Sequence, residues 1–194
     1  GGSRGIGAAI VRRLAAEGAS VAFTYVSSAD KSRALAAELE GAGASILALH
    51  ADSADAAALV AAVDEAAARF GRIDILVNNA ATNPQFCNVL ETDLGAFQKT
   101  VDVNIRGYYF MSIEGGKLMK EHGGGSIINV ASINGVSPGE FQGIYSVTKA
   151  AVISMTKVFA KECAQFGIRC NALLPGLTDT KFASALVKND AIRN

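Results

Sequence analysis

The segment Gly1-Gly2-Ser3-Arg4-Gly5-Ile6-Gly7 opens the chain, and an amphipathic pattern that predicts a helix over residues 6–17 follows it directly. Glycines let the backbone approach a phosphate closely, and the start of a helix supplies free N–H groups and the positive end of the helix dipole. The segment therefore predicts a phosphate-binding turn. An ordinary glycine-rich turn that binds no phosphate can have the same sequence pattern, so the segment alone leaves both interpretations open.

Beyond this turn, short apolar segments alternate with helical patterns. We expect helices over residues 29–40, 53–70, 92–121 and 143–166, with Ser53 capping the second and a break near Gly107 or Gly115-Gly116 in the third. We expect strands over residues 20–25, 45–50, 73–77, 126–130 and 168–174, and a loop with a short helix over residues 177–194. This order predicts an α/β fold: one doubly wound, Rossmann-type domain whose parallel sheet is covered on both faces.

Composition excludes several classes of protein. The 194 residues are 50% hydrophobic and carry 18 basic and 18 acidic side chains, so the formal net charge gives no electrostatic case for nucleic acid or an anionic membrane. No apolar run approaches the roughly 20 residues that span a bilayer. Cys87, Cys163 and Cys170 are odd in number and scattered, which favours free thiols in a reducing cytoplasm over disulfides or a metal site.

A phenol and an ammonium stand four residues apart in Tyr145-Ser146-Val147-Thr148-Lys149, where a helical pattern begins. Residues i and i+4 share a helix face, and a nearby cation lowers the pKa of a tyrosine. Such a tyrosine can exchange a proton with a substrate oxygen near neutral pH. A solvated surface pair has the same spacing, so the pair alone does not establish a site.

Polar residues gather where the expected strands end. In open α/β sheets, ligands bind beyond the carboxyl ends of the strands. Asn78, Ser132, Tyr145 and Pro175 all fall at or near such ends. The pattern therefore favours a ligand site at that edge of the sheet.

Taken in order, these motifs resemble those of the short-chain dehydrogenase/reductase family over essentially the whole chain. The resemblance implies four catalytic residues: Asn104, Ser132, Tyr145 and Lys149, with Ser132 thirteen positions before Tyr145. It also implies a set of cofactor contacts, namely Gly1, Ser3, Arg4, Gly5, Ile6, Gly7, Asp52, Asn78, Ala80, Tyr145, Lys149, Pro175, Gly176 and Thr178. Asn78-Asn79-Ala80 matches the family's N-N-A-G segment, with Ala81 in its last position.

The resemblance implies hydride transfer between a nicotinamide and a carbonyl or secondary alcohol carbon. Tyr145 is expected to act as general acid or base, Lys149 to lower its pKa and hold the ribose, and Ser132 to bind the substrate oxygen. Asn104 is expected to hold a water that links Lys149 to solvent. The family's first and last strands are not found in these 194 residues, so we expect residues 1–194 to form one dinucleotide-binding and catalytic domain of a longer enzyme.

The preferred cofactor is expected to be NADP(H), with NAD also open. Relatives that use NAD place an acidic residue at the end of the second strand, to bind the ribose 2′-hydroxyl. The corresponding residues 24–28 contain no acid, and Arg4 could pair with a 2′-phosphate with help from Thr24 and Ser27.

The substrate is constrained less well. A small carbonyl or alcohol compound is the first expectation, and the subgroup that looks most similar comprises 3-oxoacyl-carrier-protein reductases and broad carbonyl reductases. Lys181 and Lys188 are the hints of an acyl-carrier partner, and a non-catalytic binding protein of the same fold is a further alternative. The expected pocket lining is Asn83, Phe86, Val136, Phe141 and Phe182. By resemblance, the long helices over residues 92–121 and 143–166 are expected to pair in a homodimer or homotetramer.

Overall fold

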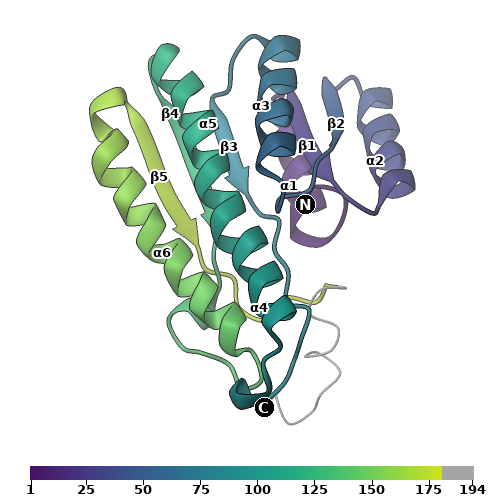
Figure 1. The fold of residues 1–194 in the computed structure, drawn as a ribbon. Coiled ribbons are helices and arrows are strands. Elements are labelled where there is room, and N and C mark those ends of the chain that lie inside the picture. Colours follow the sequence, from purple (N-terminus) through teal and green to yellow (C-terminus); the bar gives the residue numbers. More distant parts are fainter. Residues whose placement is uncertain (181–194) are drawn as a thin grey trace.

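Parallel strands form the middle layer of the molecule, and the computed structural model describes residues 1–180 (Figure 1). The strands of this part are β1 (Val21–Tyr25), β2 (Ile46–His50), β3 (Ile75–Asn78), β4 (Gly125–Val130) and β5 (Ile168–Leu173). Strands β1 and β2 form one parallel sheet, and β3, β4 and β5 form a second with β4 in the centre. The expectation of a Rossmann-type parallel α/β fold is confirmed.

Helices cover both sides of this layer. They are α1 (Gly5–Ala16), α2 (Ala29–Gly41), α3 (Ala56–Phe70), α4 (Leu94–Val101), α5 (Gly107–Glu121) and α6 (Gly143–Cys163). Helices α3, α5 and α6 lie side by side on one face (Figure 1), while α1 and α2 pack on β1 and β2. Within residues 1–180, no helix is both long and apolar enough to cross a membrane.

The two sheets are separated by a gap between β1 and β3, and the first residues of the chain lie at it. The Gly2 N–H donates to the Thr24 carbonyl at 3.0 Å, which attaches the glycine turn to the end of β1. On the other side, the Asn79 amide donates to the Gly1 carbonyl at 3.0 Å. The glycine turn is therefore fixed between the ends of β1 and β3.

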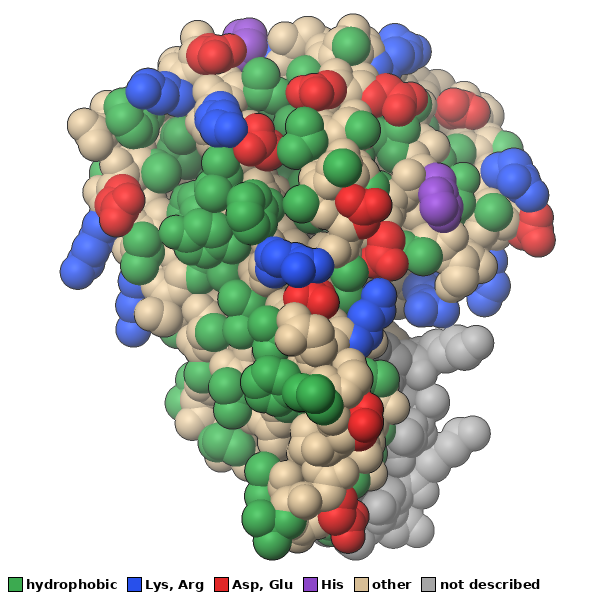
Figure 2. Space-filling model, in the orientation of Figure 1, with side chains coloured by type: hydrophobic (Ala, Val, Ile, Leu, Met, Phe, Trp, Pro, Cys, Tyr) green, Lys and Arg blue, Asp and Glu red, His purple; other side chains and the backbone are tan. Residues whose placement is uncertain are grey.

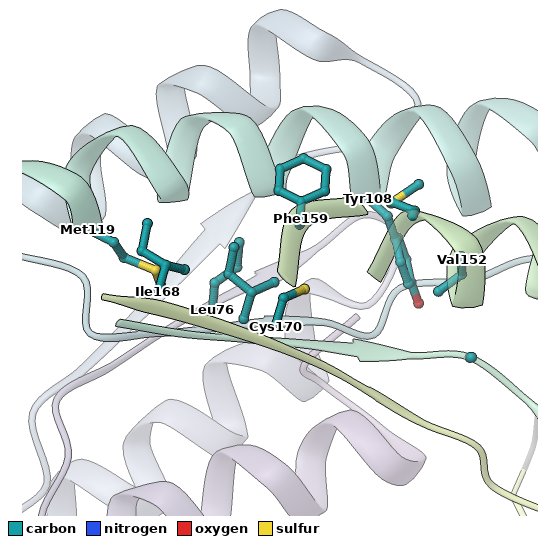
Figure 3. Packing of buried hydrophobic residues seen from close by; sticks show 10 residues of the cluster. Leu76, Tyr108, Met119, Val152, Phe159, Ile168 and Cys170 are labelled. Atoms are coloured by element: carbon teal, nitrogen blue, oxygen red, sulfur yellow. The ribbon is translucent and has the colours of Figure 1, made fainter. Parts of the chain in front are cut away.

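The larger hydrophobic core lies between the second sheet and helices α5 and α6 (Figure 3). Met119, Ile127 and Val152 are completely buried there, with Leu76 and Phe159 packed beside them. The strands are apolar along most of their length because a parallel sheet covered on both faces has no solvated side. This core positions α6, the helix that carries Tyr145 and Lys149.

A buried polar chain runs through the same core. The Asn78 amide donates to Asn129 Oδ1 at 2.8 Å and to Ser112 Oγ at 2.9 Å, and the Asn129 amide donates to Thr156 Oγ1 at 2.9 Å. An unpaired buried amide would cost about 1–3 kcal/mol, so these bonds favour a single register of β3 and β4 against the two helices.

Two details of the helices differ from the expectation. Helix α3 begins three residues later than expected, because Asp55, and not Ser53, is its N-cap and accepts from the Ala57 and Ala58 N–H groups. The break expected in residues 92–121 is a π-helical turn over Asp102–Arg106, and the helix continues through Gly115. The remaining elements lie within about three residues of their expected bounds, and the tail over residues 181–194 lies outside the described part.

Candidate active site

A cleft of about 610 Å³ lies beyond the carboxyl ends of the strands. Residues from β1, the loop after β3, β4, α6 and the segment after β5 all contribute to its lining. Most residues expected at the site line it: Gly1, Ser3, Arg4, Gly5, Ile6, Gly7, Asp52, Ala80, Ser132, Tyr145, Lys149, Pro175, Gly176 and Thr178. The structure thus brings together side chains from both ends of the sequence.

Ser132 and Tyr145 meet at this cleft. Ser132 follows the last residue of β4 by two positions, and its extended backbone makes it the N-cap of a short turn, where its hydroxyl accepts from the Asn134 N–H at 3.2 Å. Tyr145 lies in the first turn of α6, and a side-chain hydrogen bond joins it to Ser132. The two hydroxyls therefore face the same point of the cleft.

Lys149 is one helical turn further along α6 and is only 1% exposed. Its ammonium donates to the Val130 carbonyl at 2.7 Å and lies 5.6 Å from the centre of the Tyr145 ring. Burial lowers the pKa of Lys149 to about 7 because the charged form loses its hydration. Near neutral pH this side chain therefore exists in both protonation states.

The pKa of Tyr145 moves in the opposite direction from the one that the sequence predicts. Burial raises this pKa, and the hydrogen bond with Ser132 offsets part of the rise. The sequence predicts that Lys149 lowers the pKa of Tyr145. This prediction is wrong for the protein without cofactor, because the desolvation of Tyr145 is the larger effect. The Tyr145 hydroxyl consequently holds its proton at neutral pH.

Asn104 lies in the π-helical turn and is completely buried. Its Oδ1 accepts from the Thr82 N–H at 2.9 Å, and its amide donates to the Thr82 carbonyl and to Thr148 Oγ1, both at 3.0 Å. Both amide protons are thus in use, while Oδ1 accepts a single bond and keeps a lone pair to which a water could donate. Asn104 also fastens the loop after β3 to α6, beside Lys149.

The glycine turn can receive a phosphate. A Cβ on Gly7 would stand 1.9 Å from the Gly1 carbonyl oxygen, and Gly5 has a left-handed φ of +53°. Any larger residue at position 7 would push the turn out of its place above β1. The N-terminus of α1 then opens into the cleft with its first N–H groups free for an anion.

Asp52 borders the same cleft after β2. Its Oδ1 accepts from the Ala54 N–H at 2.9 Å, and its Oδ2 lies 3.3 Å from the ammonium of Lys99 on α4. The hydrogen bond from Ala54 is the main reason that the Asp52 pKa is lowered. Sequence reasoning missed Lys99, since the contact joins positions 47 residues apart.

Asn78 faces the interior rather than the cleft. It is 5% exposed, and its amide is taken up by Ser112 and Asn129. The neighbouring residues Asn79 and Ala80 are the ones that line the cleft. The Asn78 side chain thus holds its neighbours Asn79 and Ala80 in place at the cleft, and its expected cofactor contact stays a prediction.

Near Ser132 and Tyr145, the lining of the cleft differs from the substrate pocket that the sequence predicts. Phe86, Val136 and Phe141 are exposed and are not part of the lining of the cleft. Asn83 is buried and is not part of it either, and Phe182 lies outside the described residues. Asn134 and Gln142 line the cleft instead, joined by a bond of 3.0 Å from the Asn134 amide to Gln142 Oε1. Both residues lie between Ser132 and Tyr145 in the sequence, and this position is the signal from which their place at the cleft could have been predicted.

Known proteins place the chain in a family. The short chain dehydrogenase family matches residues 1–191. Dehydrogenase/reductase SDR family member 4 of Oryctolagus cuniculus is 39% identical over 187 residues, which are 96% of this chain and 72% of that protein. The L-rhamnose 1-dehydrogenase (NAD(P)(+)) of Azotobacter vinelandii is 40% identical over 185 residues, which are 93% of this chain and 72% of that protein.

Solved structures agree with this assignment. A short chain dehydrogenase from Burkholderia cenocepacia, in complex with NADP, superposes with a TM-score of 0.91 at 37% identity, covering 100% of this chain and 77% of that one. A short-chain dehydrogenase/reductase from Serratia marcescens gives a TM-score of 0.89 at 43% identity, covering 93% of this chain and 73% of that one. The protein belongs to the short-chain dehydrogenase family and is an oxidoreductase. The chain spans 65% of the length of human dehydrogenase/reductase SDR family member 4 and 77% of that of the Burkholderia cenocepacia enzyme.

Proposed function

We propose that this protein transfers a hydride between NADP(H) and the carbon of a carbonyl or secondary alcohol, with Tyr145 as the proton donor and acceptor. One observation supports this proposal above all others. Ser132, Tyr145 and Lys149 converge in the same cleft that the glycine turn and the N-terminus of α1 enter. A proton-transfer group and an anion site in one cleft are what a dinucleotide-dependent oxidoreductase needs.

The cleft has the features that a dinucleotide requires. The glycine turn and the start of α1 would hold the pyrophosphate, and Asp52, which lines the same cleft, would contact the adenine. Pro175 and Gly176 border the opposite end, where the Pro175 carbonyl accepts from the Ile133 N–H at 3.0 Å, beside Ser132. When bound, the nicotinamide supplies hydride donation or acceptance at its C4.

The residues of the chain handle the proton and the substrate oxygen. In reduction, Tyr145 gives its phenolic proton to the carbonyl oxygen while Ser132 donates a hydrogen bond to the same oxygen. The raised pKa of Tyr145 keeps it in the acid form near neutral pH, which favours reduction there. In oxidation, Tyr145 must first lose its proton, and the positive charge of Lys149 favours this loss.

In this proposal Tyr145 regains its proton through Lys149 and a water on the side of the site where Asn104 lies. Asn104 is in the π-helical turn and its amide donates to Thr148, the residue next to Lys149. Such turns interrupt the regular helix ladder and are frequent at functional sites.

Arg4 and the end of β1 favour NADP(H) over NAD(H). Arg4 is exposed at the N-cap of α1, and Ser27 and Ser28 line the cleft after β1. No acidic residue lies between Thr24 and Ser28 to repel a 2′-phosphate. Two similar structures, from Burkholderia cenocepacia and from a metagenomic library, are complexes with NADP and NADPH, which supports the same choice.

The working form would be a cytoplasmic homotetramer of chains that each contain one catalytic domain over residues 1–194. Large apolar side chains remain exposed on α4, α5 and α6, and Figure 2 shows hydrophobic side chains gathered over these helices. They include Leu94, Phe97, Tyr109, Phe110, Val147 and Val158, each at least 40% exposed. Exposed large apolar side chains on neighbouring helices favour burial against another copy of the chain.

A panel of ketones, aldehydes and secondary alcohols tests the proposed activity. The purified protein is mixed with each compound and with NADPH or NADP⁺, and the absorbance of the reduced nicotinamide is followed. The same panel with NADH and NAD⁺ gives the preference between cofactors. Turnover of at least one compound with preference for NADPH supports the proposal, whereas tight NADPH binding with no turnover of any compound favours the non-catalytic alternative. A 3-oxoacyl thioester in the panel tests the acyl-carrier subgroup. Lys181 and Lys188, the residues that hint at an acyl-carrier partner, lie outside the described residues.

A further inference from the structure

Tyr108 is a buried tyrosine beside the catalytic groups, and none of the steps above uses it. It stands in the first turn of α5, is 2% exposed, and belongs to the main hydrophobic core. Figure 3 shows its ring between α5 and the sheet, with the hydroxyl oxygen pointing toward the strands. A phenylalanine would satisfy the core equally well, so the position of the hydroxyl calls for an explanation.

The ring and the hydroxyl of Tyr108 both meet the environment of Lys149. The Tyr108 hydroxyl donates to the Val130 carbonyl at 3.2 Å, and that same oxygen accepts from the Lys149 ammonium at 2.7 Å. The ammonium also lies 5.1 Å from the centre of the Tyr108 ring and 5.6 Å from that of Tyr145. Lys149 thus has an aromatic ring of α5, an aromatic ring of α6 and a carbonyl of β4 around its charge.

No carboxylate stands among these neighbours. Within the described residues, the carboxylates of Asp52 and Asp102 form ion pairs with other cations, namely Lys99 and Arg106. A buried ammonium without a counter-charge depends on dipoles and on ring faces for its stability. Burial also raises the pKa of Tyr108 above its ordinary range, so its hydroxyl remains a hydrogen-bond donor wherever the enzyme works.

The backbone fixes Tyr108 in this place. The π-helical turn that carries Asn104 sets the rotation of α5, which begins directly after it. The preceding Gly107 packs so closely on the neighbouring loop that a Cβ would stand 2.5 Å from the Ser53 carbonyl oxygen. The backbone of Tyr108 is therefore fixed, and burial in the core together with the bond to the Val130 carbonyl keeps the ring beside Lys149.

We propose that Tyr108 is a positioning residue that keeps Lys149 charged and in place: its ring face supports the ammonium, and its hydroxyl holds the Val130 carbonyl to which the ammonium is bound. The catalytic consequence rests on the proposed function, since a charged Lys149 is what assists Tyr145. The effect on Lys149 itself stands independently of any turnover.

The test is a direct titration of Lys149 in a series of ring variants. Lysine is labelled with ¹³C at Cε, and the Lys149 signal is identified by its loss in Lys149→Met. Tyr108→Phe keeps the ring and serves as the reference. Monofluoro- and trifluorophenylalanine at position 108 keep the shape of the ring and progressively remove its negative face.

The Lys149 pKa is expected to fall stepwise along the fluorinated series, by about half a unit to one and a half units at its end. The same substitutions at Tyr109, which is 42% exposed and packs on Phe159 and Phe110, are the matched control and should leave Lys149 unchanged. A constant Lys149 pKa across the 108 series, or equal changes in both series, would overturn the proposal.

Kinetics then separate this proposal from the proposed function. If the enzyme oxidises an alcohol, the rising limb of its pH–rate profile should move to higher pH along the 108 series, because a neutral Lys149 no longer favours ionisation of Tyr145. If no compound is turned over, the titration still decides the role of Tyr108. An unmoved pH–rate profile, combined with a falling Lys149 pKa, would contradict the link from Lys149 to Tyr145 and leave the positioning of Lys149 standing.

Discussion

Lys149 and Tyr108 donate hydrogen bonds to one and the same oxygen, the main-chain carbonyl of Val130, at 2.7 and 3.2 Å. This shared acceptor joins α5, α6 and the end of β4 at a single point. The site is consequently part of the core, and changes in its side chains should alter stability as well as activity.

The first prediction concerns pH and stability. The pKa of Lys149 is about 7 in the folded protein against 10.5 for an ordinary lysine, so below pH 7 the folded state carries the full cost of the buried charge. As the pH rises from 7 toward 10.5, the folded state releases this proton and the unfolded state keeps it, so this group makes the protein more stable. The free energy of unfolding should rise by up to about 1.4 kcal/mol per pH unit in this range.

Urea titrations of the wild type and Lys149→Met at several pH values measure this effect. The difference between the two proteins isolates Lys149 from the other groups that titrate in the range. Lys157→Met, at an exposed position of the same helix, is the control and should keep the wild-type slope. An equal slope in wild type and Lys149→Met would show that Lys149 is not perturbed by burial.

The second prediction concerns Asn104. Asn104→Ala removes three hydrogen bonds and leaves the Thr82 N–H and carbonyl without their partner. We expect a loss of about 3 kcal/mol in the free energy of unfolding and a fall in kcat through displacement of Lys149. A double-mutant cycle with Thr148→Val, measured by urea titration, should give a coupling energy of about 1 kcal/mol. Strict additivity of the two changes would mean that Asn104 does not hold α6.

The third prediction concerns the choice of cofactor. Arg4→Ala should weaken NADPH binding about tenfold to a hundredfold, the size of a charge-assisted hydrogen bond, and leave NADH binding nearly unchanged. Fluorescence titration with each cofactor measures both constants. Arg13→Ala, on the same helix and paired with Glu17 at the surface, is the control. Equal losses for the two cofactors would refute the contact between Arg4 and the 2′-phosphate.

Much of the fold could be predicted because its signals are local. The apolar segments of residues 45–50 and 126–130 and the glycines at 18, 71 and 167 place the element ends within a few residues. Ser132 and Tyr145 could be placed together because the carboxyl ends of parallel strands share one edge. Asp55 was missed as a cap because Ser53 has equal capping ability in the sequence, and only the hydrogen bonds distinguish them.

The rest of the site depends on burial, which the sequence does not show. Tyr145 and Lys149 have the expected spacing, yet desolvation decides the direction of the Tyr145 pKa and brings that of Lys149 to about 7. Tyr108 lies 41 positions before Lys149, and its contact follows from the packing of α5 on α6. Phe86 and Phe141 were expected in the pocket because they are apolar loop residues, a property that does not say which way they face.

The most direct measurement of the central claim is the turnover of Tyr145→Phe compared with its affinity for NADPH. The hydroxyl alone is removed, so we expect kcat to fall at least about 100-fold while the Kd for NADPH stays within a few-fold of the wild-type value. Tyr109→Phe, away from the cleft, should keep full activity. Near-complete activity of Tyr145→Phe would contradict the assignment of Tyr145 as the proton-transfer group.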